Sequence, residues 1–195
     1  MDARAFTALK GLVAAGAALP GGEPHLARAL RFLGQEIDRQ MLADGGHAER
    51  SPGALVAVVM DLIEIRSMLA TARVAVPDAL TAAIDRAMPM LAALRHGDGG
   101  LALFNGTREG DPALLALVQA QSAVRARPAS RAPEMRFERL TAGRTVLIVD
   151  AGPPPARGQD RLAHAGTLAF EMSVGRDRLI VNCGAAPAAA SGWRD

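Results

Sequence analysis

The sequence predicts an α+β protein, in which an antiparallel array of helices is followed by antiparallel strands. Half of the 195 residues are hydrophobic, which is enough to bury a sizeable core. Apolar residues recur every three or four positions up to about residue 95, as in helices. Beyond residue 135 the pattern changes to short apolar segments separated by glycine-containing turns. We therefore divide the chain into a helical part (1–96), a connector with a short strand and a helix (97–134) and a strand part (135–195).

Four helices are expected in the helical part, with limits at 3–19, 24–42, 52–72 and 77–95. Segments rich in glycine and proline separate them. Ser51 followed by Pro52 is typical of a helix start, with a capping hydroxyl before a proline at the first helical position. Pro89 lacks an N–H group and crowds the preceding turn, so we expect it to kink or interrupt the fourth helix.

The connector and the strand part are predicted from turn residues. "GDGGLALFNGT" indicates a short strand between turns, and Asp111 with Pro112 begins a helix that runs to about residue 123. Strands are then expected at 136–140, 144–150, 167–174 and 178–183. An antiparallel sheet of about four strands needs a cover for its apolar face. Since the last strands have no visible partner, we expect an incomplete chain.

Composition limits the classes of function. The formal net charge is +2, and the single cysteine, Cys183, cannot form an intramolecular disulfide. No segment reaches the roughly 18 apolar residues of a transmembrane helix. The segment "GLVAAGAALP" fits a packed helix better than a signal peptide, because Asp2 precedes it and its apolar residues form a helical stripe. The arginine-rich segment "VRARPASR" lacks interleaved aromatic residues, so nucleic acid is not an expected partner.

Four motifs in a fixed order resemble those of a known family. They are "DGGHAERSP", "RHGDGGLALFNG", "RLTAGRTVLIVDAGPPP" and "HAGTLAFEMSVGRDRLIVNCG". Together they are similar to bacterial heparinase II/III-like proteins, which are polysaccharide lyases with a helical α/α toroid followed by a β-sandwich. The resemblance implies that residues 1–96 are the end of the toroid and residues 135–195 the start of the sandwich. It also implies that members of the family are longer at both ends.

The resemblance further implies β-elimination on an acidic polysaccharide that contains uronic acid. This reaction needs a base, a group that neutralises the carboxylate and an acid for the leaving oxygen. His47 is the candidate base or neutralising group, because the pKa of free histidine, about 6.5, lies near neutral pH. Glu49 and Arg50 are candidates to orient His47 or to bind the substrate. The alternative is that the glycines of this motif only turn the chain and that His47 bonds to a helix end.

His164 is the second catalytic candidate. It lies in "LAHAGT", where the family typically has His-Ala-His-Ala-Asp-Thr, so Leu162 and Gly166 replace the first histidine and the aspartate. Asn182 stands near the position of a further family aspartate. His164 and Asn182 are therefore only weak candidates for binding the structural zinc or calcium ion known in the family, and no cofactor is expected. The alternative for His164 is a histidine whose partners are backbone groups.

Two functions remain open from the sequence. The family's lyases use a tyrosine as acid or base, and this sequence contains none. The chain is therefore expected to be either a lyase that requires further sequence or a non-catalytic relative that binds polysaccharide. Asn105 is a minor candidate for sugar binding, whereas His25 and His96 are expected to cap helix ends. The family implies a location in the cell envelope or periplasm, and the rest of the fold would come from further sequence or an oligomer.

Overall fold

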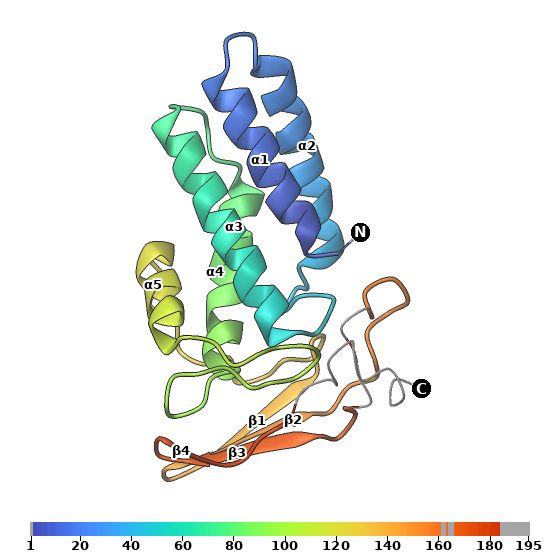
Figure 1. Ribbon diagram of the computed structural model, residues 1–195, viewed down its shortest axis with the longest axis vertical. Helices are drawn as coiled ribbons and strands as arrows, with labels where there is room; N and C mark the ends of the chain where they lie inside the picture. Colours follow the sequence, from blue (N-terminus) through green and yellow to red (C-terminus); the bar gives the residue numbers. More distant parts are fainter. Residues whose placement is uncertain (1, 161–162, 164–165, 184–195) are drawn as a thin grey trace.

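The computed structural model describes residues 2–160, 163 and 166–183. These residues form five helices and one antiparallel sheet, so the predicted α+β class is confirmed. In Figure 1 the long helices stand side by side and the sheet lies across one end of them, with the connector between. The helices are α1 (Arg4–Ala18), α2 (Glu23–Gln40), α3 (Pro52–Thr71), α4 (Asp78–Ala93) and α5 (Pro112–Ser122). The strands are β1 (Phe137–Ala142), β2 (Thr145–Asp150), β3 (Phe170–Val174) and β4 (Asp177–Ile180).

Helix α3 is the centre of the helical part. It packs against α1, α4 and α5, and its apolar side chains are buried on most of its surface. As predicted, Ser51 caps it: the Ser51 hydroxyl accepts a hydrogen bond from the amide of Ala54, and Pro52 occupies the first turn. None of the described helices is both long and apolar enough to cross a lipid bilayer.

Two predicted features differ in the structure. Helix α4 continues through Pro89, so of the expected kink or interruption the interruption is wrong, and the kink stays a prediction. Buried side chains on both sides of Pro89, among them Ile84 and Leu91, hold the helix in place. Residues 101–104 form no strand beyond an isolated bridge between Leu101 and Arg95. The amide of Leu103 instead donates to the Glu171 side chain, a partner distant in sequence.

The sheet is a meander in the order β1-β2-β3-β4, with every neighbouring pair antiparallel. One face turns toward the helices and carries the buried Phe137 and Ile148 together with several polar residues. The other face carries a row of apolar residues paired across all four strands: Leu140, Leu147, Met172 and Ile180. The described residues leave Leu140 57% and Ile180 39% exposed.

The connector between α2 and α3, residues 41–51, approaches the backbone of α4 at Gly45. Gly45 has a φ of +86°, and a Cβ atom there would collide with the backbone carbonyl of Arg86. We expect Gly45→Ala to lower the free energy of unfolding by about 3 kcal/mol in urea titrations. Gly21 is the matched control, because its φ is +72° and it has open space around it, so Gly21→Ala should cost only about 1 kcal/mol. Equal losses for the two variants would contradict the collision.

Candidate functional site

His47 lies inside the α2–α3 connector with no exposed surface. Its Nε2 is 3.1 Å from Gln40 Oε1, and its Nδ1 accepts a hydrogen bond of 3.2 Å from the amide of Glu49. Because Nδ1 accepts, the ring proton is on Nε2 and is donated to Gln40, whose amide donates in turn to Glu36. Burial lowers the pKa of His47 to about 4, so the ring is neutral at pH 7. The His47 ring therefore faces the interior of the protein, and its catalytic role stays a prediction.

The burial of His47 predicts a dependence of stability on pH. In the unfolded chain the ring gains its proton near its ordinary pKa of 6.5, whereas in the folded chain it does so near 4. Between these two pKa values the unfolded state binds more protons than the folded state. The free energy of unfolding therefore has its full value above the unfolded pKa and falls as the pH drops toward the folded pKa. We expect a loss of about 2 kcal/mol from pH 7 to pH 5 in urea unfolding. His47→Gln should remove this loss, and an unchanged pH profile in that variant would contradict it.

Arg50 is also buried, with its guanidinium turned toward the sheet. It donates to the carboxylate of Asp150 and to the carbonyl of Pro153, and its Nε lies 2.9 Å from the carbonyl of Met135. The guanidinium also lies 5.2 Å from the centre of the Phe137 ring, within cation–π distance. Arg50 thus joins the α2–α3 connector to the start of β1 and the end of β2. A role in substrate binding would require these bonds to break.

Asn105 stabilises the same junction. Its side-chain amide donates a 2.8 Å hydrogen bond to the carbonyl of Arg50, and its side chain is buried. The backbone of Asn105 has a φ of 44° and that of Gly106 a φ of 75°, so the chain turns sharply here. The predicted turn at Asn105-Gly106 is present, and the Asn105 side chain is turned inward to the protein.

Glu49 borders an open cleft of about 500 Å³. The cleft lies between the start of α1, the start of α3 and residues 106–108, and Arg4, Ser51, Thr107 and Arg108 also line it. Glu49 Oε1 accepts a 2.7 Å hydrogen bond from the amide of Ala3. Thr107 Oγ1 lies 3.3 Å from Ser51 Oγ and accepts a 2.9 Å bond from the amide of Gly53. Carboxylate, hydroxyl and guanidinium groups therefore line one cleft, where sugar hydroxyls and acidic groups find partners. Arg4 and Arg108 are exposed there, whereas Glu49, Ser51 and Thr107 are almost fully buried.

The remaining predicted residues are partly outside the described chain. His164 lies outside the described residues, as does Leu162. Asn182 donates from its backbone amide and from its side-chain amide to Glu171 Oε1, at 3.1 and 3.2 Å. A metal would need the oxygen of Asn182, and in the part of the chain that the structure describes, no three potential metal ligands gather. Because His164 lies outside the described residues, metal binding by His164 and Asn182 stays a prediction.

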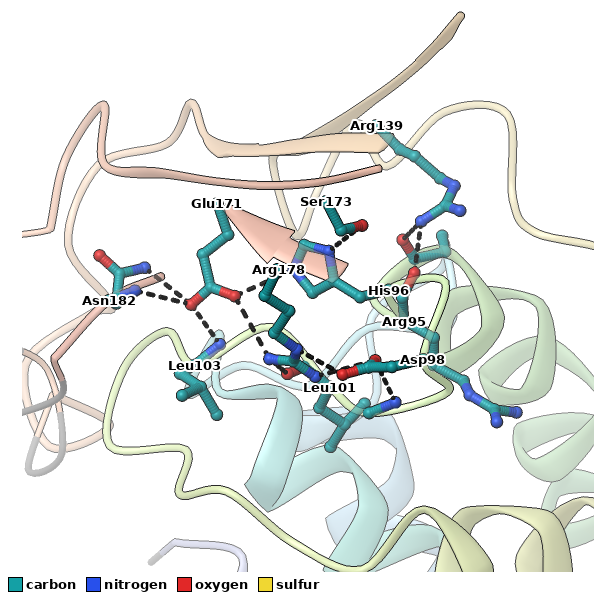
Figure 2. A network of polar contacts seen from close by, with 12 residues as sticks. Arg95, His96, Asp98, Leu101, Leu103, Arg139, Glu171, Ser173, Arg178 and Asn182 are labelled. Carbon is teal, nitrogen blue, oxygen red and sulfur yellow. Dashed lines mark hydrogen bonds and ion pairs between the residues drawn. The ribbon is translucent and has the colours of Figure 1, made fainter. Parts of the chain in front are cut away.

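A buried polar network joins the end of α4 to β3 and β4 (Figure 2). His96 Nδ1 lies 2.9 Å from Ser173 Oγ, and His96 Nε2 lies 2.9 Å from Glu171 Oε2. The expectation that His96 caps a helix end is wrong: Arg139 binds the carbonyls of Ala93 and Arg95 instead, at 2.9 and 2.7 Å. The sequence did contain a signal for the network. Residues alternate between the two faces of a strand, so "FEMSV" places the polar residues Glu171 and Ser173 together on one face, and this face is the buried one.

Arg178 completes the network from β4. Its Nε lies 2.7 Å from Asp98 Oδ2, and its Nη1 donates to the carbonyl of Leu101 at 3.0 Å. The hydrogen bond from Arg178 is the main reason that the pKa of Asp98 lies below its usual value. Burial raises the pKa of Glu171, but hydrogen bonds from His96 and from the amides of Leu103 and Asn182 outweigh this effect and lower it. Both carboxylates are therefore ionised at neutral pH.

Comparisons with known proteins identify similar sequences and similar folds. Residues 124–195 match the family described as "Heparinase II/III-like, C-terminal". FtsZ-localized protein C from Caulobacter vibrioides is 38% identical over 178 residues, which cover 90% of this chain and 31% of that protein. The crystal structure of heparinase III superimposes with a TM-score of 0.78 at 12% identity, covering 94% of this chain and 35% of that one. A heparan sulfate lyase from Pedobacter heparinus gives a TM-score of 0.72 at 14% identity, covering 97% and 34%.

These matches confirm the family resemblance inferred from the four motifs. The two structural likenesses describe the fold, and the family match covers the end of the connector at residues 97–134 together with the strands. The chain spans about a third of the length of the proteins it matches. On this basis residues 124–195 match the C-terminal region of the heparinase II/III-like family, and the chain shares the fold of the corresponding third of the heparinase III structure.

Proposed function

We propose that this chain contributes a binding site for an acidic polysaccharide and does not itself carry out β-elimination. The observation that supports binding is the cleft of about 500 Å³ beside Glu49. Arg108 can pair with a sugar carboxylate or sulfate, and the carboxylate of Glu49 can accept hydrogen bonds from sugar hydroxyls. Arg4 lies at the same cleft and already pairs with Asp2 at 2.6 Å, so Arg108 is the principal cation for the ligand.

The geometry of His47, a predicted catalytic residue, and of Arg50, a predicted substrate-binding residue, supports binding without cleavage. Both ring nitrogens of His47 are engaged, and the ring is buried and neutral at pH 7. It is therefore neither free to take a proton from a sugar nor charged to neutralise a uronate. The guanidinium of Arg50 is committed to Asp150, and the sequence offers no tyrosine to act as acid or base.

The name of the Caulobacter relative supports a proposal about location. That protein is named for its localisation to FtsZ, and it is 38% identical to this chain. We therefore propose that this protein lies with FtsZ in the cell, and the envelope location that the family implies stays a prediction. A fluorescent fusion that overlaps with labelled FtsZ would support this location, and a fusion spread evenly through the cell would contradict it.

Lyase activity is the second candidate function. The observation that favours it is that Glu49 and Arg108 line one cleft, where a carboxylate can act as base and a guanidinium can neutralise the substrate carboxylate. This candidate predicts a new ultraviolet absorbance from an unsaturated uronate, and the binding function does not.

The test uses this 195-residue chain. Heparin, alginate and glucuronan oligosaccharides are titrated in a calorimeter and followed for ultraviolet absorbance. We expect binding without an absorbance change, and about tenfold weaker binding in Glu49→Gln and in Arg108→Gln, because a charge-assisted hydrogen bond contributes roughly 1.5–3 kcal/mol. Arg86→Gln is the control, since Arg86 is exposed on α4 and does not line the cleft.

The other outcomes of this test contradict the binding function or favour the lyase function. An absorbance increase that disappears in Glu49→Gln would establish the lyase reaction and overturn the binding-only proposal. Absence of binding to every oligosaccharide would overturn the proposed function. Equal weakening in Arg86→Gln would show that binding depends on general positive charge and does not involve the cleft.

A further inference from the structure

We infer that Glu171 and Arg178 of the sheet are positioning residues for the wall of the polysaccharide cleft. The wall is part of the α4–α5 loop, residues 94–111, whose members Gly106, Thr107 and Arg108 line the cleft. Glu171 and Arg178 are not among the residues that line it, so their effect passes through this loop. The inference rests on the proposed function.

The first half of the α4–α5 loop is attached to the sheet (Figure 2). Arg178 binds both oxygens of Asp98, with Nε at 2.7 Å from Oδ2 and Nη2 at 3.2 Å from Oδ1, and its Nη1 binds the carbonyl of Leu101 at 3.0 Å. Glu171 Oε1 accepts the amide of Leu103 at 2.8 Å. Side chains from β3 and β4 therefore hold three residues within a six-residue stretch of the loop: Asp98, Leu101 and Leu103.

The second half of the loop is attached to the α2–α3 connector and the start of α3. Asn105 donates to the carbonyl of Arg50, and Thr107 accepts the amide of Gly53. Leu103 is bound to the sheet, and Asn105 is bound to the α2–α3 connector. Only Phe104 lies between them. Because consecutive Cα atoms are about 3.8 Å apart, this short spacer leaves little slack, and we expect a shift of Leu103 to be passed on to the residues that line the cleft.

The loop depends on these side chains because its own backbone bonds are few. Among the described residues, the bonds that its amides make to backbone carbonyls are concentrated in the turn from His96 to Ala102, and the amide of Thr107 bonds to Phe104. The amide of Leu103 has Glu171 as its partner. The Glu171 side chain has no exposed surface, so its bond to the amide of Leu103 is shielded from competing water. The side chains of Arg178 and Asp98 are 16% and 30% exposed, so their ion pair is shielded in part.

The test compares Arg178→Gln with Arg139→Gln. Arg139 lies in the same junction but binds the carbonyls of Ala93 and Arg95 at the end of α4, before the part of the loop that Arg178 holds. Both variants therefore weaken the contact between helices and sheet, and only Arg178→Gln releases Asp98 and Leu101. Hydrogen exchange of the amides of residues 98–108 is measured without ligand, and binding of a heparin oligosaccharide is measured by calorimetry, both in the full protein.

We expect faster exchange at residues 98–108 and about tenfold weaker binding in Arg178→Gln. Arg178→Lys should recover part of the affinity, because lysine keeps the charge but loses the two-pronged bond to Asp98. Arg139→Gln should leave the hydrogen exchange of residues 98–108 and the affinity for the oligosaccharide unchanged, even if it lowers the melting temperature.

Other results overturn the inference. Equal weakening of binding by Arg178→Gln and Arg139→Gln would show a general structural effect, and unchanged exchange at residues 98–108 in Arg178→Gln would show that the loop does not need this attachment. A wild-type protein that binds no oligosaccharide would overturn the proposed function instead, and hydrogen exchange alone would then decide whether Arg178 positions the loop.

Discussion

Arg50→Ala should lower the free energy of unfolding by about 4 kcal/mol. The substitution leaves the carboxylate of Asp150, which is 2% exposed, without its cationic partner in a buried site. It also removes the donors to the carbonyls of Met135 and Pro153 and the cation–π contact with Phe137. Urea unfolding followed by circular dichroism measures the loss, and a change in the slope with denaturant would show whether the unfolding stays cooperative.

Two further variants test the origin of this loss. Arg86→Ala removes an exposed guanidinium from α4 and should change stability by less than about 0.5 kcal/mol. Asp150→Asn in the Arg50→Ala background removes the unpaired charge and should recover a large part of the stability. An Arg50→Ala protein as stable as Arg86→Ala would refute the role of Arg50 in joining the connector to the sheet.

Glu171→Ala is expected to destabilise the fold by a similar amount, about 4 kcal/mol. Glu171 accepts hydrogen bonds from His96, from the amide of Leu103 and from two donors of Asn182, and it has no exposed surface. Its removal takes this partner from the buried ring of His96 and from the partly buried donors of Leu103 and Asn182. Thermal and urea unfolding measure the loss, and native-state hydrogen exchange should show the amide of Leu103 among the most affected.

The control is a glutamate of the same sheet. Glu138 on β1 is exposed, so Glu138→Ala should be close to neutral. Glu171→Gln keeps the shape of the side chain but offers one acceptor oxygen where the carboxylate offers two, and an intermediate loss is expected. A neutral effect of Glu171→Ala would mean that water replaces the carboxylate in the network.

The sequence predicted the elements whose signals are local. Ser51 and Asp111 cap their helices as expected, because a capping hydroxyl or carboxylate bonds to an amide only two or three residues away. The strands followed from two-residue alternation around glycine turns. The continuous helix through Pro89 was missed because burial against other helices outweighs the local cost of proline.

The candidate site was predicted less well, because its contacts are distant in sequence. The motif that contains His47, Glu49 and Arg50 was recognised, but which of these residues lines a cleft depends on the start of α1 and on residues 106–108. His96 and Glu171 are separated by 75 positions, so neither could be assigned to the other from spacing. The polar residues on the inner face of β3 were the available sign that a buried network exists there.

The inner face of the sheet has a consequence for how the chain avoids misfolding. Each strand directs one charged residue toward the helical part: Arg139 from β1, Asp150 from β2, Glu171 from β3 and Arg178 from β4. A slip of any strand by one residue would turn its charged group outward and bring its apolar row residue inward. The charged residue of a slipped strand would lose its ionic or hydrogen-bonded partners. Incorrect strand pairings are therefore disfavoured by this loss as well as by the turns that connect the strands.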